Sequence, residues 1–313
     1  MSLDLPYCPP PGALIEIAAE EQSLAEEISA VILEPFQPLR EQFMAITGVG
    51  LDINADDVDQ SLRRLHVTPA GAAQAQPLSL LAAGHPDGAR VIFIHGSPGL
   101  GEEWLPLMTA VPDGQLYLAP DRPGFGDSGD IAVTDLQAQA DALVPLLGRQ
   151  PETPVVLVGY SYGGPVALRL AADHPDRVGG LLLIGAAVDP GLEEIHPLQE
   201  IAALTFFERL LPSELANSNA ELLRLRDGLD VLAGDLTDLH LPVIMVQGTA
   251  DNLVPASNVD YLRAQMAATP AAIMIEGADH FLPWSHPDLL AKALDCLLDD
   301  ARDYTSGGVS STR

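Results

Sequence analysis

The sequence predicts an α/β fold, in which a mainly parallel sheet of the eight-stranded type carries helices on both faces. Short runs of leucine and β-branched residues, bounded by turn residues, alternate with stretches in which apolar residues recur at helical spacing. This alternation is typical of βαβ units. Catalytic groups are then expected at the carboxyl ends of the strands.

Length and composition indicate one domain with insertions. The chain has 313 residues, of which 47% are hydrophobic, so it can bury a full core. We expect a helical extension over residues 1–60, a core over 61–190 and 240–302, a helical lid insertion over 191–239 and a flexible tail over 303–313.

The N-terminal extension is predicted to contain two helices between residues 20 and 47. Leu24 and Ile28 begin one apolar stripe, and Leu39 begins a second after Pro35 and Pro38. The polar face is acidic, whereas helices that lie on membranes are normally basic. We therefore expect the extension to pack on the core.

Buried strands and their connecting helices follow the extension. The strands are predicted over residues 78–82, 90–95, 116–119, 154–158, 181–186, 242–247 and 271–275. Helices are predicted over residues 137–147, 165–172, 258–266 and 286–298, with further helical pieces at 198–211 and 220–232 in the lid. Phe206, Phe207 and Leu210 of the lid could line a substrate pocket, although their helical spacing favours packing of the lid against the core.

Ser161 is the predicted nucleophile. The pattern Gly-x-Ser-x-Gly around it would occur by chance in roughly one chain in ten of this length. Here, however, it follows a predicted strand and opens a predicted helix, as a nucleophile elbow requires. Side chains at Gly159 or Gly163 would collide with the neighbouring strand and helix, so glycine is needed at both positions.

A second glycine loop, which begins with His95 and Gly96, is predicted to supply half of an oxyanion hole. A tetrahedral intermediate needs two backbone N–H donors, which we assign to Ser97 and Tyr162. Pro98 disfavours the helical region for Ser97 and so favours an extended donor. For the His95 side chain we expect a structural role.

His280 is the predicted general base, because it follows the last predicted strand in a loop that can reach the elbow. His286 and His174 are interpreted as residues at helix ends. Asp251 is the predicted acid that orients His280, since it too follows a strand at the same edge of the sheet. Asp189, which follows the preceding strand, is the alternative acid.

These segments together resemble the α/β-hydrolase superfamily over residues 61–301, and specifically its branch of serine esterases and lipases. The loop at residues 121–128 and the turn that carries Asp251 also match the family, which uses the order Ser, acid, His. Epoxide hydrolases and dehalogenases share the glycine loop but have aspartate as nucleophile. Epoxide hydrolases also generally carry tyrosines in the lid, and the lid of this chain has none.

Composition excludes several other classes. A formal charge of −29 disfavours nucleic acid and anionic membranes as partners, and reflects an acidic surface, salt adaptation or repulsion of anionic substrates. Cys8 and Cys296 show neither a disulfide framework nor zinc spacing, so we expect two ordinary thiols. No signal peptide or transmembrane run is evident, so we expect a cytoplasmic protein.

The resemblance and the motifs predict a serine hydrolase of carboxylic esters, which needs no metal or organic cofactor. Its partner would be a small-molecule ester or related acyl substrate. Two alternatives stay open. The same triad could cleave an activated carbon–carbon bond or an amide, or the chain could bind a ligand with little turnover. The sequence does not fix the oligomeric state.

Overall fold

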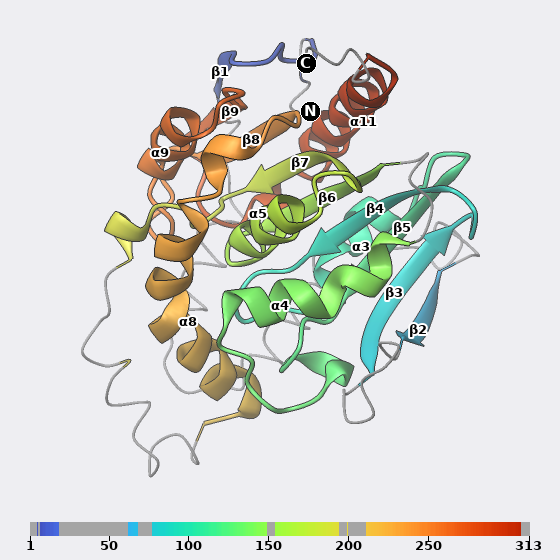
Figure 1. Ribbon diagram of the computed structural model, residues 1–313, viewed down its shortest axis with the longest axis vertical. Coiled ribbons are helices and arrows are strands. Elements are labelled where there is room, and N and C mark those ends of the chain that lie inside the picture. Colours follow the sequence, from blue (N-terminus) through green and yellow to red (C-terminus); the bar gives the residue numbers. More distant parts are fainter. Residues whose placement is uncertain are drawn as a thin grey trace.

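The computed structural model describes residues 5, 7–18, 62–67, 77–148, 154–193, 199 and 211–307. Over these residues, the strands form one nine-stranded sheet in the order β1-β9-β8-β7-β6-β4-β5-β3-β2 (Figure 1). The pairs of β3 with β2 and with β5 are antiparallel, and every other pair is parallel. The expected mainly parallel sheet is confirmed.

The central strands lie within a few residues of their predicted positions. They are β3 (Leu78–Gly84), β4 (Ala89–Ile94), β5 (Gln115–Pro120), β6 (Val155–Tyr160), β7 (Val178–Ile184), β8 (Val243–Gly248) and β9 (Ala271–Glu276). The two edge strands, β1 (Leu14–Ala18) and β2 (Arg63–Val67), were not predicted. Both are short, and β2 mixes exposed with half-buried side chains, so neither presents a buried apolar run.

The predicted helices at 137–147, 165–172, 220–232, 258–266 and 286–298 are also present, and the one predicted at 198–211 lies almost wholly outside the described residues. They are α4 (Leu136–Leu143), α5 (Gly163–Asp173), α8 (Ser213–Leu232), α9 (Ser257–Gln265) and α11 (Pro287–Gly307), and the short α3 (Leu105–Met108) and α10 (Leu282–Ser285) accompany them. Helix α4 ends at Leu143, and the chain continues as a 3-10 turn over Val144–Leu147, because Pro145 has no N–H to donate to an α-helical hydrogen bond. At the other end of the chain, α11 continues well past residue 298, into the predicted tail.

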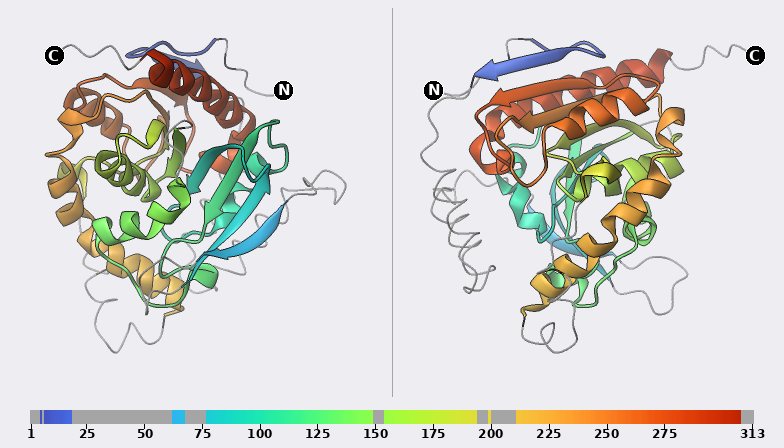
Figure 2. Two further views of the ribbon diagram at one scale, coloured as in Figure 1. Left: turned by 45° about the vertical axis from the view of Figure 1, so that its right-hand side comes forward. Right: turned by 90° about the vertical axis from the view of Figure 1, so that its left-hand side faces the viewer.

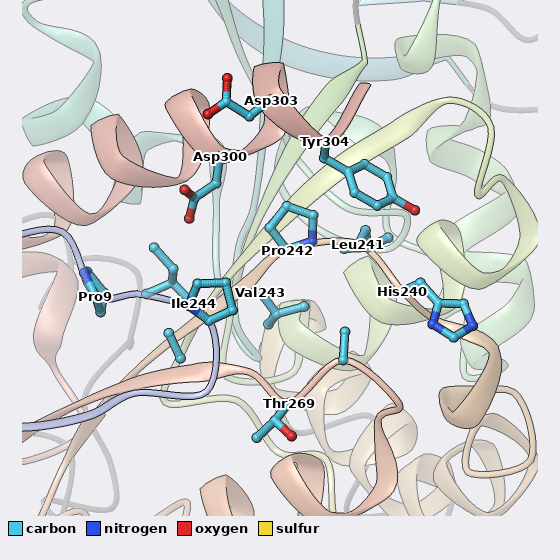
Figure 3. Close-up of a pocket in the computed structure, with 13 residues that line it drawn as sticks. Pro9, His240, Leu241, Pro242, Val243, Ile244, Thr269, Asp300, Asp303 and Tyr304 are labelled. Atoms are coloured by element: carbon cyan, nitrogen blue, oxygen red, sulfur yellow. The ribbon is translucent and has the colours of Figure 1, made fainter. Parts of the chain in front are cut away.

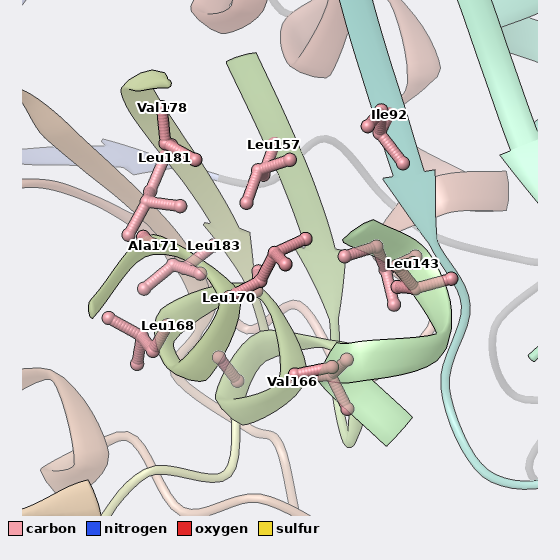
Figure 4. Packing of buried hydrophobic residues seen from close by; sticks show 14 of the residues in the cluster. Ile92, Leu143, Leu157, Val166, Leu168, Leu170, Ala171, Val178, Leu181 and Leu183 are labelled. Carbon is pink, nitrogen blue, oxygen red and sulfur yellow. The ribbon is translucent and has the colours of Figure 1, made fainter. Parts of the chain in front are cut away.

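Helices cover both faces of the sheet. Ile92 of β4 points to the side of α4 and α5, whereas its neighbour Phe93 points to the side of α3 and α11. This alternation is the two-residue period of a strand, and here both faces are apolar because both are covered. Figure 4 shows Leu157 and Leu183 of the sheet beside Leu170 of α5.

The N-terminal segment belongs to the sheet. β1 pairs in parallel with β9, and Arg263 of α9 donates to the carbonyl oxygens of Gly12 and Ala13 at 2.9 Å each. In this part of the extension the chain is therefore a strand. The two helices predicted between residues 20 and 47 lie outside the described residues.

Cys8 and Cys296 form a disulfide, so the expectation of two ordinary thiols is wrong. Their Cα atoms lie 5.4 Å apart, although 288 positions separate them in sequence. Sequence spacing did not reveal the pair, because only the docking of the N-terminal segment brings Cys8 beside α11. Figure 2 shows β1 and α11 at the same end of the molecule.

A cavity of about 280 Å³ lies near this tethered segment. Figure 3 shows it between Pro9, Pro242 at the start of β8, and Asp300 and Tyr304 of α11. The cavity is thus at the amino end of β8, whereas Asp251 follows the carboxyl end of that strand. The cavity therefore lies at the opposite end of the strands from their carboxyl ends, where catalytic groups are expected.

The predicted insertion over residues 191–239 is described in part. The long helix of its described part is α8, which contacts α4 and α5. Phe206, Phe207 and Leu210, the predicted pocket residues, lie outside the described residues. Among the helices of the described part, none combines the length and the apolar character that a membrane crossing requires.

Candidate active site

Ser161 lies at the turn between β6 and α5 with a φ of +52°, and it is the one non-glycine residue of the described chain with positive φ. A side chain rarely adopts this backbone conformation, which persists only where the surroundings impose it. The Ser161 N–H donates to Ile184 O of β7 at 2.9 Å, and its carbonyl oxygen accepts from Gly164 N at 3.0 Å. The turn is therefore held from both sides.

The flanking glycines are required by close packing. A Cβ atom at Gly159 would lie 2.5 Å from the carbonyl oxygen of Gly163, and one at Gly163 would overlap the carbonyl oxygen of Ile94. Gly96 of the second glycine loop is close as well, since a Cβ atom there would lie 3.2 Å from Ser161 Cβ. The loop that carries Gly96 and Ser97 therefore lies directly against Ser161.

Asp251 and His280 are brought together at the carboxyl ends of β8 and β9. His280 Nδ1 and Asp251 Oδ2 are 2.7 Å apart, and both side chains are buried. The other carboxylate oxygen, Oδ1, accepts from the backbone N–H of Leu253 at 2.9 Å and of Val254 at 2.7 Å. These hydrogen bonds fix the orientation of the Asp251 carboxylate toward the imidazole.

The alternative acid, Asp189, has a different partner. Its side chain accepts from Gly191 N at 2.8 Å and so caps the 3-10 turn Pro190–Leu192. Its backbone N–H donates to Asn258 Oδ1. Of the two carboxylates, Asp251 is therefore the one hydrogen-bonded to His280.

His280 lies close to the elbow. Its ring centroid is 5.0 Å from that of Tyr160, the residue before Ser161. A Cβ atom at Gly185, directly after β7, would lie 3.2 Å from His280 Nδ1. The carboxyl ends of β6, β7, β8 and β9 thus converge on one place, as expected for a parallel sheet.

His95, His174 and His286 lie in positions that indicate structural roles. His95 is fully buried, and burial together with the charge of Arg122 lowers its pKa well below the usual value. Its Nε2 accepts from Arg122 N at 2.8 Å, so the ring is neutral and its proton is on Nδ1. His174 and His286 follow the last residues of α5 and α10, which confirms that they lie at helix ends.

The second glycine loop, which carries Gly96 and Ser97, contacts helix α8. Ser97 Oγ donates to Ser218 Oγ of α8 at 2.8 Å, and the peptide bond between Ser97 and Pro98 is cis. Beneath the loop, Arg122 forms a buried two-pronged ion pair with Glu221 of α8, at 2.8 and 2.9 Å. Sequence reasoning missed this pair, because no local pattern links two residues from separate parts of the chain.

Glu103 is a further buried ionisable residue that sequence reasoning missed. It is 1% exposed, its Oε1 accepts from Leu100 N at 3.0 Å, and its Oε2 has no hydrogen-bond partner. Burial raises the pKa of its carboxyl to about 8. No local sequence pattern marks Glu103 as buried, because its burial depends on distant parts of the chain.

Comparison with known proteins gives one family and several relatives. Residues 91–293 match the model of the alpha/beta hydrolase family. The chain is 28% identical to the pimeloyl-[acyl-carrier protein] methyl ester esterase of Photorhabdus laumondii over 239 residues, 64% of this chain and 89% of that protein. It is 43% identical to the lipase LipV of Mycobacterium tuberculosis over 100 residues, 32% of this chain and 38% of that protein.

A solved structure shows the same fold. The structure of a thermophilic esterase from Thermogutta terrifontis superimposes with a TM-score of 0.60 at 21% identity, covering 77% of this chain and 99% of that one. At this identity the likeness is one of fold alone.

Proposed function

The chain belongs to the alpha/beta hydrolase family, and from this we propose that it hydrolyses carboxylic esters through Ser161, His280 and Asp251. The observation that carries the proposal is the conformation of Ser161. Its left-handed backbone places this half-buried serine in the turn after β6, at the carboxyl ends of the strands, where His280 and Asp251 are hydrogen-bonded. A serine with only a structural role gains nothing from such a costly conformation.

The hydrogen bond between His280 and Asp251 is consistent with His280 as the general base. With Nδ1 as the donor to Asp251, a neutral His280 carries its proton on Nδ1 and can accept another at Nε2. In the proposed first step, His280 takes the proton of Ser161 while the serine oxygen attacks the ester carbonyl carbon. His280 then gives that proton to the leaving alcohol, and an acyl-enzyme remains.

In the second half of the reaction, water is the nucleophile and Ser161 is the leaving group. His280 takes a proton from water, the hydroxide oxygen attacks the acyl carbon, and Ser161 leaves with that proton as the carboxylic acid forms. In both halves the backbone N–H groups of Ser97 and Tyr162 are the proposed donors to the oxyanion.

The substrate class rests on the relatives. A methyl ester esterase and a lipase are among them, and the alternatives of carbon–carbon or amide cleavage use the same triad. The formal charge of −29 is unfavourable for highly anionic substrates. We therefore propose a carboxylic ester of low negative charge as the substrate.

The experiment combines a fluorophosphonate probe with short and long p-nitrophenyl esters. We expect wild-type protein to be labelled and to hydrolyse at least one ester, and Ser161→Ala to lose both activities. Ser257→Ala, which removes an exposed serine at the start of α9, is the matched control and keeps both. Unchanged labelling of Ser161→Ala would contradict the nucleophile assignment.

The disulfide bears on where the protein acts. Disulfides persist in oxidising compartments and are rare in the cytoplasm. The Cys8–Cys296 bond therefore favours an oxidising compartment over the cytoplasmic location that the sequence predicts.

A further inference from the structure

Arg122 lies completely buried behind the proposed oxyanion loop. Its Nε donates to His95 O at 3.0 Å, and its Nη2 donates to Gly96 O at 2.7 Å. The other hydrogen bonds of its side chain are the two to the carboxylate of Glu221. Burial of a guanidinium lowers stability unless its N–H groups are hydrogen-bonded. The hydrogen bonds to His95 O and Gly96 O are therefore needed for Arg122 to remain buried.

One of these carbonyl groups belongs to the peptide that carries a proposed oxyanion donor. Gly96 O and the Ser97 N–H are parts of the same peptide unit, which is trans. In a trans peptide the C=O and N–H bonds lie in one plane and point in opposite directions. Whatever fixes Gly96 O on one side therefore fixes the direction of the Ser97 N–H on the other.

Gly96 O receives two hydrogen bonds from buried groups. The first comes from Arg122 Nη2 and the second from His95 Nδ1 at 2.8 Å. His95 is held as a Nδ1 donor because its Nε2 accepts from the Arg122 backbone N–H. A positive charge on the carbonyl side also polarises the peptide and makes its N–H a better donor.

The same guanidinium contacts the second proposed donor residue. Arg122 Cζ lies 4.6 Å from the centroid of the Tyr162 ring, on one side, and 4.9 Å from that of Phe125. These are cation–π distances, and both rings shield the charge from water. Arg122 is thus linked to both residues whose backbone N–H groups are assigned to the oxyanion.

The position of Arg122 depends on α8. Glu221 of that helix is 1% exposed and pairs with Arg122 Nη1 and Nη2, while Gln139 of α4 donates to the same carboxylate at 3.3 Å. Ser218, three residues earlier on α8, accepts from Ser97 Oγ. Helix α8 therefore contacts the oxyanion loop in two ways. Ser218 binds the Ser97 side chain, and Glu221 binds Arg122, which in turn binds backbone carbonyl groups of the loop.

We propose that Arg122, held by Glu221, is a positioning residue that directs the Ser97 N–H toward the oxyanion, so that α8 sets the geometry of the oxyanion hole. This inference rests on the proposed function. It assigns helix α8 a part in the chemical step.

The expected signature is a loss in kcat with little change in KM. Charge on the carbonyl oxygen is largest in the tetrahedral transition state, so a misdirected donor weakens that state more than the bound ester. Removal of a complete oxyanion donor lowers kcat by about 10²–10³. For Glu221→Gln, which frees Arg122 to move, we expect kcat to fall about ten- to a hundredfold while KM changes less than about threefold.

The experiment uses the full chain, p-nitrophenyl esters and the fluorophosphonate probe, at a temperature well below the thermal midpoint of every variant. Arg169→Gln is the matched control, because it breaks the ion pairs of another largely buried arginine, with Asp173 and Asp235, neither of which belongs to the oxyanion loop. We expect Glu221→Gln to slow both ester turnover and phosphonylation of Ser161, and Arg169→Gln to lower the thermal midpoint with kcat kept.

Arg122→Lys provides the second variant if Glu221→Gln does not fold. Lysine keeps the charge opposite Glu221 but lacks the planar fork that reaches His95 O and Gly96 O together, so the same fall in kcat is expected. Equal kcat losses in Glu221→Gln and Arg169→Gln, a loss confined to KM, or an unchanged kcat in Arg122→Lys would each overturn the inference. Wild-type protein that is neither labelled nor active would instead overturn the proposed function, and the inference with it.

Discussion

Two aspartates of the site differ in what surrounds their carboxylates. Asp251 bonds His280 and two backbone N–H groups, whereas Asp189 caps a 3-10 turn. We expect Asp251→Asn to lower kcat about 10⁴-fold, because the amide favours the wrong imidazole tautomer. Asp189→Asn is the matched control and should keep kcat within about threefold. Steady-state kinetics decide, and a larger loss at position 189 would reverse the assignment of the acid.

Glu103 gives a pH-dependent contribution to stability. Its carboxyl has a pKa of about 8 in the folded protein, raised by burial, against about 4.3 in an unfolded chain. Between these two values the folded state holds one more proton, so the free energy of unfolding falls as pH rises toward 8. Above pH 8 the folded protein holds an ionised Glu103 whose Oε2 has no hydrogen-bond partner, and this lowers the free energy of unfolding.

Glu103→Gln should remove this pH dependence. The amide is neutral at every pH and keeps an acceptor for Leu100 N. Denaturant unfolding at pH 6 and pH 9 measures the effect, and we expect the variant to lose less stability than wild type between the two. Glu102→Gln, at the neighbouring and half-buried position, is the control. Equal slopes in wild type and Glu103→Gln would show that Glu103 is ionised in the folded protein.

At the scale of elements, the elbow depends on how closely α5 approaches β4. The Cα of Gly163 faces the carbonyl oxygen of Ile94, and an added Cβ would overlap it. Gly163→Ala must push α5 away from the sheet, which we expect to cost about 1–3 kcal/mol of stability. Because α5 carries the Tyr162 N–H at its start, kcat should fall too.

The matched control for this substitution is Gly234→Ala, after the end of α8. A Cβ at Gly234 would meet its nearest neighbour, Val231 O, at 3.6 Å, which is an ordinary contact. We expect it to change stability by less than about 0.5 kcal/mol. Unfolding midpoints in urea provide the comparison, and a Gly163→Ala variant as stable and active as the control would contradict the packing argument.

At the scale of the whole molecule, the disulfide fastens the N-terminal segment to α11. It closes a loop that includes most of the chain, and such bonds contribute about 2–4 kcal/mol by restricting the unfolded state. Cys8→Ser should lose that amount, and β1 should become easier to detach from β9. Cys8 is exposed, so its replacement leaves no cavity, unlike that of the buried Cys296.

Guanidinium unfolding with and without dithiothreitol measures the effect of the bond, with Cys8→Ser as the reference that reductant cannot alter. Esterase activity should persist, because the bond is at the edge of the sheet occupied by β1, whereas Ser161 follows the central strand β6. A reductant effect as large in Cys8→Ser as in wild type would show that the bond is not its cause.

Sequence alone determined the features that have a local signal. The central strands and the helices beside them follow from apolar runs and periodicity, since a doubly covered sheet requires continuous burial. The strand–turn–helix context of Ser161 likewise predicted an elbow, because its glycines satisfy a local steric requirement. The positions of Asp251 and His280 after their strands indicated which sheet edge they share, and no more than that.

The tertiary structure decided everything that joins distant parts of the chain. Strand β1, the Cys8–Cys296 bond and the Arg122–Glu221 pair each join segments whose local sequences carry no sign of one another. The raised pKa of Glu103 has the same origin, because burial is set by the folded surroundings and not by neighbours in sequence. Sequence periodicity reports which face of an element is covered, and only folding determines by what.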